Sequence, residues 1–217
     1  MNLNNFLEFK SAFQTNSQLG QDALVLWFLN QKANGYFIEF GAADGVNISN
    51  TFLLEKDYGW SGILCEPAKV YKDRLSANRK CTIVDKCVYS KSGDVISFFE
   101  SENEELSTIS SYKESDLHSV NRINGITYDV ETISLSDLLN NFSAPAIIDY
   151  LSMDTEGSEF DIIKEYDFSR HINIITVEHN YSDNREKIKN FLEEKNFIRI
   201  FDSISEWDDW YINTEIK

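Results

Sequence analysis

The chain contains 217 residues, of which 42% are hydrophobic and 13% aromatic, proportions that are typical of a globular protein and exclude a disordered chain. The formal net charge is -16, and no basic stripe interrupts the acidic residues, which argues against nucleic acids and anionic membranes as partners. Because the sequence has neither a signal-peptide pattern nor an apolar stretch of about 18 residues, we expect a soluble, cytoplasmic protein.

Apolar residues at helical spacing alternate along the chain with short continuous apolar runs, which predict helices and buried strands respectively. In chain order the pattern predicts a helix at 22–31, a strand at 36–40, a helix at 50–57, a strand at 62–65, a helix at 69–77, strands at 81–84 and 95–100, an extended segment at 127–133, a short helix at 134–139, a strand at 146–152, a helix at 158–165, a strand at 172–177, a helix at 184–194, and strands at 197–201 and 210–212. This alternation is typical of a doubly wound, mostly parallel α/β sheet, here closed by an antiparallel C-terminal strand. In such sheets ligands bind at the carboxyl ends of the strands.

Nothing in the sequence divides the chain, since there is no internal repeat and no low-complexity tract, and we predict one domain over residues 1–217. Residues 101–124 are polar, and we interpret them as a long loop or lid in which Tyr112 covers the substrate. The three cysteines lack metal-binding spacing and are expected to be reduced core thiols. The sequence does not determine the oligomeric state, and a homo-oligomer is compatible with it.

A glycine-containing turn follows the first predicted strand. Gly41 and Gly45 have the spacing GxxxG instead of the GxGxxG of dinucleotide-binding proteins. Glycine lets the backbone turn tightly and approach a ligand closely, although an ordinary strand-to-helix turn also explains these two residues. Glu39, just before the turn, would repel a pyrophosphate but attract the ammonium and sulfonium groups of a cationic methionine moiety.

Acidic residues also end the next two strands. Glu66 follows the second strand, where a carboxylate can accept hydrogen bonds from both ribose hydroxyls of an adenosyl group. Asp85 follows the third strand, where it can accept from the amino group of adenine. A helix N-terminal acid and a turn acid are the alternatives for these two residues. Together with the glycine turn, Glu66 predicts an adenosyl cofactor.

Four motifs resemble the FkbM family of S-adenosylmethionine-dependent methyltransferases: Ser17–Asp22, Phe37–Gly45, Cys65–Pro67 and Leu151–Glu159. The resemblance covers residues 17–180. It implies a Rossmann-like class I methyltransferase fold and, most often, methylation of an oxygen atom on a small molecule. The chain departs from the commoner pattern at Glu39, where the family has Asp, and at the two residues before Asp154, and these departures leave the substrate open.

The resemblance also implies which residues hold the cofactor. Ser17 and Gln18 precede the first predicted helix and would meet the methionine carboxylate, which a helix N-terminus favours. The alternative for Ser17 is a helix cap. The full set expected to bind S-adenosylmethionine is Ser17, Gln18, Glu39, Gly41, Gly45, Glu66, Asp85 and Asp154.

The reactive groups are expected after the fourth and fifth strands of the parallel sheet, whose carboxyl ends face one crevice. Asp154 and Glu156 follow one of these strands, and Glu178 and His179 end the other. Asp154, Glu178 and His179 are predicted ligands of Mg, Mn or Fe that would polarise the acceptor hydroxyl, and Glu156 is predicted to take its proton.

This arrangement is similar to that of metal-dependent O-methyltransferases acting on sugars of macrolide and aminocoumarin antibiotics, except that His179 stands where those enzymes have an acid. Three alternatives stay open at this point. Glu156 can satisfy helix N-terminal N–H groups, His179 can be a general base without metal, and the site can act by positioning alone.

We therefore predict methyl transfer from S-adenosylmethionine to a hydroxyl of a small polar acceptor. A sugar or nucleotide-linked sugar is favoured, because an acid-rich crevice suits a polyol better than a lipid. A non-catalytic S-adenosylmethionine-binding module is one alternative. A nucleotide-cofactor oxidoreductase is another, and the absence of GxGxxG argues against it.

Overall fold

The computed structural model describes residues 2–114 and 117–217. Its α-helices are α1 (Leu3–Ser11), α2 (Gln21–Phe28), α3 (Phe52–Tyr58), α4 (Lys72–Asn78), α5 (Leu135–Asn141), α6 (Glu159–Ile163) and α7 (Asn184–Glu194). Its strands are β1 (Tyr36–Phe40), β2 (Ser61–Cys65), β3 (Thr82–Val84), β4 (Cys87–Val88), β5 (Val95–Ser101), β6 (Thr108–Ile109), β7 (Gly125–Ile133), β8 (Ile147–Met153), β9 (His171–Glu178), β10 (Phe197–Ile200) and β11 (Asp208–Asn213). Short 3-10 helices are η1 (Lys69–Tyr71), η2 (Glu104–Leu106), η3 (Ser110–Tyr112) and η4 (Leu117–Asn121).

Within the described residues the larger sheet has seven strands in the order β10-β11-β9-β8-β1-β2-β3. Strands β1, β2, β3, β8 and β9 run parallel, and β11 is antiparallel to both of its neighbours, as predicted for the C-terminal strand. The register pairs Phe40 with both Cys65 and Met153, and Met153 with Val177. The residues that follow these four strand ends therefore lie along one edge of the sheet.

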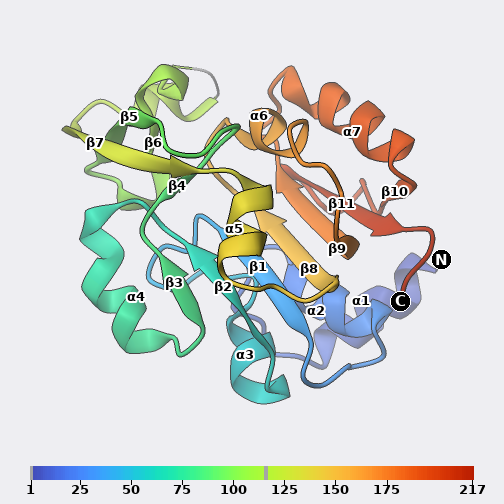
Figure 1. Cartoon of the computed structure of the whole chain (residues 1–217). Helices are drawn as coiled ribbons and strands as arrows, with labels where there is room; N and C mark the ends of the chain where they lie inside the picture. Colours follow the sequence, from blue (N-terminus) through green and yellow to red (C-terminus); the bar gives the residue numbers. More distant parts are fainter. Residues whose placement is uncertain (1, 115–116) are drawn as a thin grey trace.

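Alternating side chains of the central strands supply two apolar cores, one on each face of the larger sheet. Phe37 packs into the core covered by α1 to α4, whereas Ile38 packs into the core covered by α5 to α7. Figure 1 shows the sheet lying between helices on both of its faces. This two-sided burial explains why the strands appear in the sequence as continuous apolar runs.

A smaller sheet, which the sequence did not predict as a separate unit, has the order β4-β7-β5-β6 among the described residues. Strands β5 and β7 were both expected, and they pair antiparallel with each other instead of joining the larger sheet. Its inner face, with Phe98 and Val130, packs on Ala43 and Tyr71 near the glycine turn. The smaller sheet lies across one end of the larger one (Figure 1).

The polar segment 101–124, predicted as a loop or lid, contains η2, β6, η3 and η4. It is tied to the edge of the larger sheet, because the Thr108 hydroxyl donates to the Glu156 carbonyl at 2.9 Å. Helix α1 was not predicted, since its polar sequence has a single fully buried residue, Phe6, which stacks on Phe201. Across residues 2–114 and 117–217, no helix has the length and apolar character needed to cross a membrane.

Candidate active site

The glycine turn after β1 is shaped by the close approach of another part of the chain. Gly41 has φ +73°, and a Cβ atom at this position would lie 1.9 Å from the Asp154 carbonyl oxygen. Gly45 has φ +78°, and a Cβ there would lie 2.6 Å from side-chain atoms of Leu75 and Arg79. Packing within the protein therefore requires glycine at both positions. Glycine also leaves room for a ligand that approaches the turn.

A cavity of about 60 Å³ lies beside this turn, along the ends of β1, β2 and β8. It is lined by Phe40, Gly41, Ala43, Ile48, Cys65, Glu66, Pro67, Tyr71, Cys87, Val88, Phe98, Glu104, Glu105, Ser107, Ile109, Asp154, Thr155 and Glu156. Small-molecule sites usually enclose about 300–1,000 Å³. Residues of the 101–124 segment, such as Glu104 and Ile109, form part of the cavity wall.

Glu66 occupies the position predicted for ribose recognition. Its buried carboxylate accepts hydrogen bonds from the backbone N–H groups of Ala43 at 2.9 Å and Ala68 at 2.8 Å. Burial raises the pKa of Glu66 to about 7, although the two N–H donors oppose this shift. The adjoining wall is apolar and includes Tyr71 and Val88, which suits the flat face of a purine.

Because ribose hydroxyls donate to an ionised carboxylate, S-adenosylhomocysteine is expected to bind more weakly at pH values below the Glu66 pKa. The ionised fraction of Glu66 rises with pH, so affinity should increase by up to about tenfold per unit below pH 7 and level off above it. Calorimetric titrations between pH 5.5 and 8.5 measure this dependence. The matched variant is Glu66→Gln, in which the rise should disappear; an identical rise in the variant would assign it to another group.

Asp85, predicted near adenine, lies outside this cavity. Its side chain is exposed and pairs with Lys72 Nζ at 3.1 Å. It borders a separate hollow that shares only Glu66 and Pro67 with the cofactor cavity. The structure therefore does not bring Asp85 together with the other residues expected to bind the cofactor, because the chain turns outward after the short strand β3.

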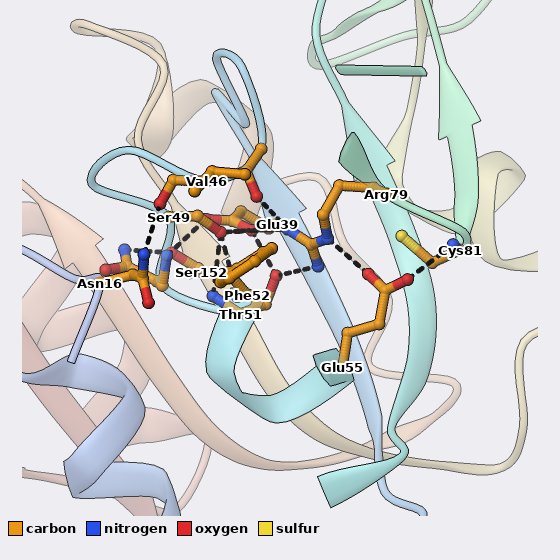
Figure 2. A network of polar contacts seen from close by, with 12 residues as sticks. Asn16, Glu39, Val46, Ser49, Thr51, Phe52, Glu55, Arg79, Cys81 and Ser152 are labelled. Atoms are coloured by element: carbon orange, nitrogen blue, oxygen red, sulfur yellow. Dashed lines mark hydrogen bonds and ion pairs between the residues drawn. The ribbon is translucent and has the colours of Figure 1, made fainter. Parts of the chain in front are cut away.

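Glu39 is buried in a polar network behind the glycine turn and does not line the cavity (Figure 2). Its carboxylate accepts hydrogen bonds from the Asn50 N–H at 2.7 Å, the Ser49 hydroxyl at 3.0 Å and the Thr51 hydroxyl. Burial raises the pKa of Glu39, while the nearby Arg79 guanidinium lowers it. In this structure Glu39 anchors residues 49–51 of the loop that follows the glycine turn.

Arg79, at the end of α4, completes this network and was not singled out from the sequence. Its guanidinium lies 3.8 Å from Glu39, bonds to Glu55, and donates to the Gly45 carbonyl at 3.0 Å (Figure 2). It also donates to the Thr51 hydroxyl at 2.9 Å. One buried cation therefore holds the middle and the end of the 41–51 loop, part of which lines the cavity.

Ser17 and Gln18 are placed differently from each other. The buried Ser17 hydroxyl donates to Asp22 at 2.6 Å, so it braces the start of α2 from outside the helix, whose N-cap is Gly20. Gln18 is exposed, and its side-chain oxygen accepts from Trp207 Nε1 at 3.3 Å. Of the two, only Gln18 lines a cavity, and that cavity is the second one described below.

Three acids meet where β8 and β9 end. The side chains of Asp154, Glu156 and Glu178 each offer an oxygen within 4.8 Å of the others. The Asn180 amide donates to Glu178 at 2.7 Å and to Glu156 at 3.3 Å. Burial raises the pKa of Asp154 and Glu178, and the Asp154 charge raises that of Glu178 further. Both carboxyls therefore hold protons more tightly than an exposed acid.

His179, predicted as a metal ligand and base, does not join these acids. Its Nδ1 accepts from the Tyr181 N–H at 3.0 Å, and its Nε2 lies 3.7 Å from Asp209. Burial lowers the pKa of His179 to about 4, so the ring is neutral at pH 7. His179 follows the last residue of β9, and its ring lies toward Asp209, whereas Glu178 lines the cavity that Asp154 and Glu156 also line.

A fully buried arginine from the 101–124 segment reaches the acids, and sequence reasoning missed it. Arg122 bonds Glu156 at 2.5 Å and donates from Nε to the Leu106 carbonyl at 2.8 Å. A buried guanidinium is tolerated only where carboxylates or carbonyls satisfy it. The segment is thereby fastened to the acid cluster.

A second cavity, of about 430 Å³, adjoins the first at these acids. Its lining residues are Gln18, Ile48, Asn103, Glu105, Leu106, His118, Asn121, Asp154, Glu156, Glu178, Asn180, Tyr181 and Trp207. The two cavities share Ile48, Glu105, Asp154 and Glu156. A ligand in one would therefore meet a ligand in the other beside Asp154.

The strand order and the antiparallel β11 define a Rossmann-like fold of the class I methyltransferase type. The chain belongs to the family with the methyltransferase FkbM domain, which it matches over residues 39–210. This confirms the resemblance carried by the sequence motifs, and the family implies S-adenosylmethionine as methyl donor.

One solved structure supports the fold. A methyltransferase FkbM from Methylobacillus flagellatus superposes with a TM-score of 0.52 at 10% identity, covering 97% of this chain and 58% of that protein. The chain thus spans 58% of the length of that relative. A precorrin-6y C5,15-methyltransferase from Geobacter metallireducens gives 0.48 at 12% identity, covering 94% of both chains. No curated protein matches the sequence.

Proposed function

We propose that the protein transfers the methyl group of S-adenosylmethionine to a hydroxyl of a small polar acceptor, either a sugar or a nucleotide-linked sugar. The observation that carries this proposal is the junction of the two cavities at Asp154, where buried carboxyls lie beside the cofactor cavity. Carboxyls at this point can accept the proton that a hydroxyl must lose as it is methylated.

The cofactor would lie along the first cavity. Glu66 accepts from the ribose hydroxyls, the apolar wall with Tyr71 holds the adenine, and the backbone of Gly41 meets the methionine moiety. Asp154, at the shared end, then faces the cationic end of the cofactor, where a carboxylate stabilises the ammonium and sulfonium charges.

In the transfer step the acceptor oxygen attacks the methyl carbon in line with the breaking carbon–sulfur bond. The products are a methyl ether, S-adenosylhomocysteine and one proton, which passes to Asp154 or Glu178. Burial raises the pKa of both carboxyls, which makes each a stronger proton acceptor than an exposed acid. Glu156, the base expected from the sequence, is engaged by Arg122, and this favours the other two acids.

The same three acids are also suited to bind a divalent cation. Three carboxylate oxygens within 4.8 Å of one another suit Mg or Mn, which prefer hard oxygen ligands. With His179 directed elsewhere, the nitrogen ligand that would have suited Fe is missing from the set. Arg122 would have to leave Glu156 before that carboxylate could bind a metal ion.

The test is transfer of a labelled methyl group from S-adenosylmethionine to a panel of sugars and nucleotide-linked sugars, with added Mg²⁺ or with EDTA. The proposal predicts an O-methyl product, identified by NMR. Methylation of carbon would contradict it. Cofactor binding without transfer to any sugar would favour the non-catalytic module. If EDTA abolished methyl transfer and Mg²⁺ restored it, the three acids would be identified as ligands of a metal ion.

A further inference from the structure

The second cavity carries a charge pattern that narrows the class of acceptor. Four carboxyl groups line it, from Glu105, Asp154, Glu156 and Glu178, and its described lining residues include no lysine or arginine. Its other polar groups are mostly amides, such as Asn103 and Asn121 in the 101–124 segment. A phosphate or pyrophosphate in this cavity would be repelled at short range without a compensating cation.

The protein's own contacts show that this cluster binds a cation. The Arg122 side chain is fully buried, and its guanidinium forms an ion pair with Glu156, one of the acids of this cluster. A desolvated guanidinium of this kind is stable only beside acceptors of negative charge. The remaining acids, Asp154 and Glu178, face the cavity without a lysine or arginine partner among the described residues.

Glu105 adds an acid at the junction of the two cavities. It is exposed, it lines both cavities, and it has no hydrogen-bond or ion-pair partner in the described part of the chain. Its neighbour Glu104, by contrast, is paired with Arg74. An unpaired carboxylate at this point is available to a bound molecule.

From these observations we infer that the acceptor is an amino sugar, a polyol with an ammonium group, and not a phosphorylated sugar. This inference rests on the proposed function and narrows its class of acceptor, the sugars, to amino sugars. The ammonium group would bond to the exposed Glu105 carboxylate through charge-assisted hydrogen bonds, and Asp154 or Glu178 would accept the hydroxyl proton. The cavity, at about 430 Å³, falls within the range of small-molecule sites, and Trp207 offers an apolar face for a sugar ring.

The same acids would also direct the methyl group to oxygen. A protonated nitrogen has no lone pair and cannot attack the sulfonium methyl group. Carboxylates that keep the nitrogen protonated therefore leave a hydroxyl as the nucleophile, and its proton passes to Asp154 or Glu178. The expected product is an O-methyl amino sugar with its nitrogen unmodified.

The experiment measures binding of D-glucosamine, D-glucose and D-glucose 6-phosphate by ligand-observed NMR to the protein saturated with S-adenosylhomocysteine, at fixed salt and pH 7. We expect glucosamine to bind at least about fivefold more tightly than glucose, and glucose 6-phosphate more weakly than either. In Glu105→Gln the preference for glucosamine should fall about three- to fivefold. The matched control is Glu114→Gln, which removes one exposed charge from the same segment outside the cavity and should leave the preference unchanged.

Tight binding of glucose 6-phosphate, no binding of glucosamine, or equal effects of the two variants would overturn the inference. Methylation of the glucosamine nitrogen would also overturn it. These results are distinguishable from failure of the proposed function. If the proposed function were wrong, the protein would not bind S-adenosylhomocysteine, and this would be seen in the same samples before any sugar is added.

Discussion

Replacing Arg79 by methionine is expected to lower the free energy of unfolding by about 3–5 kcal/mol, since removal of one partner from a buried ion pair leaves an uncompensated charge. The side chains of Arg79 and Glu39 are almost fully buried, at 1% and 4% exposed. Methionine fills a similar volume but donates no hydrogen bond. Glu55 and the Gly45 carbonyl would lose their arginine donor at the same time.

Urea denaturation of the ligand-free protein measures this loss. The control is Arg74→Met, because Arg74 forms an ion pair with Glu104 at the surface, where such pairs contribute about 0–1 kcal/mol. Equal, small losses in the two variants would show that the buried network does not stabilise the glycine turn. Since Arg79 holds the 41–51 loop at Gly45 and Thr51, its variant should also bind S-adenosylhomocysteine more weakly.

Glu178→Gln is expected to lower kcat by about 10²- to 10⁴-fold while leaving the Kd for S-adenosylhomocysteine within about threefold of the wild-type value. Glutamine keeps the shape of the side chain and an oxygen that can accept from Asn180. It cannot take up the acceptor proton. Glu178 lines the second cavity and not the first, so the loss should appear in turnover and not in cofactor affinity.

His179→Gln is the informative comparison for this variant. The sequence predicted that His179 is catalytic, whereas its ring nitrogens lie against Tyr181 and Asp209. The folded fraction of His179→Gln should therefore keep a rate within a few-fold of wild type. Full activity of Glu178→Gln, or abolished turnover in a folded His179→Gln protein, would reverse the two roles.

The sequence predicted the larger sheet because its strands are buried on both faces and appear as continuous apolar runs. The smaller sheet was missed, although both β5 and β7 were expected. Their pairing joins residues as far apart as Val95 and Glu131, and local patterns carry no information about such partners. Helix α1 was missed for a related reason, since its one buried side chain, Phe6, is stabilised by contacts with distant aromatic residues.

At the site, the acids that follow strand ends were predictable because parallel strands bring their carboxyl ends to one edge. Asp154 and Glu178 meet for this reason. The buried arginines were not predictable, because Arg79 and Arg122 lie in segments without a recognisable motif and act on acids far away in sequence. His179 was misplaced because adjacent residues at a strand end were taken to face the same side.

The most direct test of the account is calorimetric titration of the wild-type protein with S-adenosylhomocysteine at pH 7.5, in the presence and absence of EDTA, beside Glu66→Ala. We expect binding in the micromolar range under both conditions and a clearly weaker affinity for the variant, since Glu66 is the proposed ribose acceptor. Absence of binding under both conditions, together with binding of a nicotinamide dinucleotide, would contradict the assignment of the first cavity to S-adenosylmethionine.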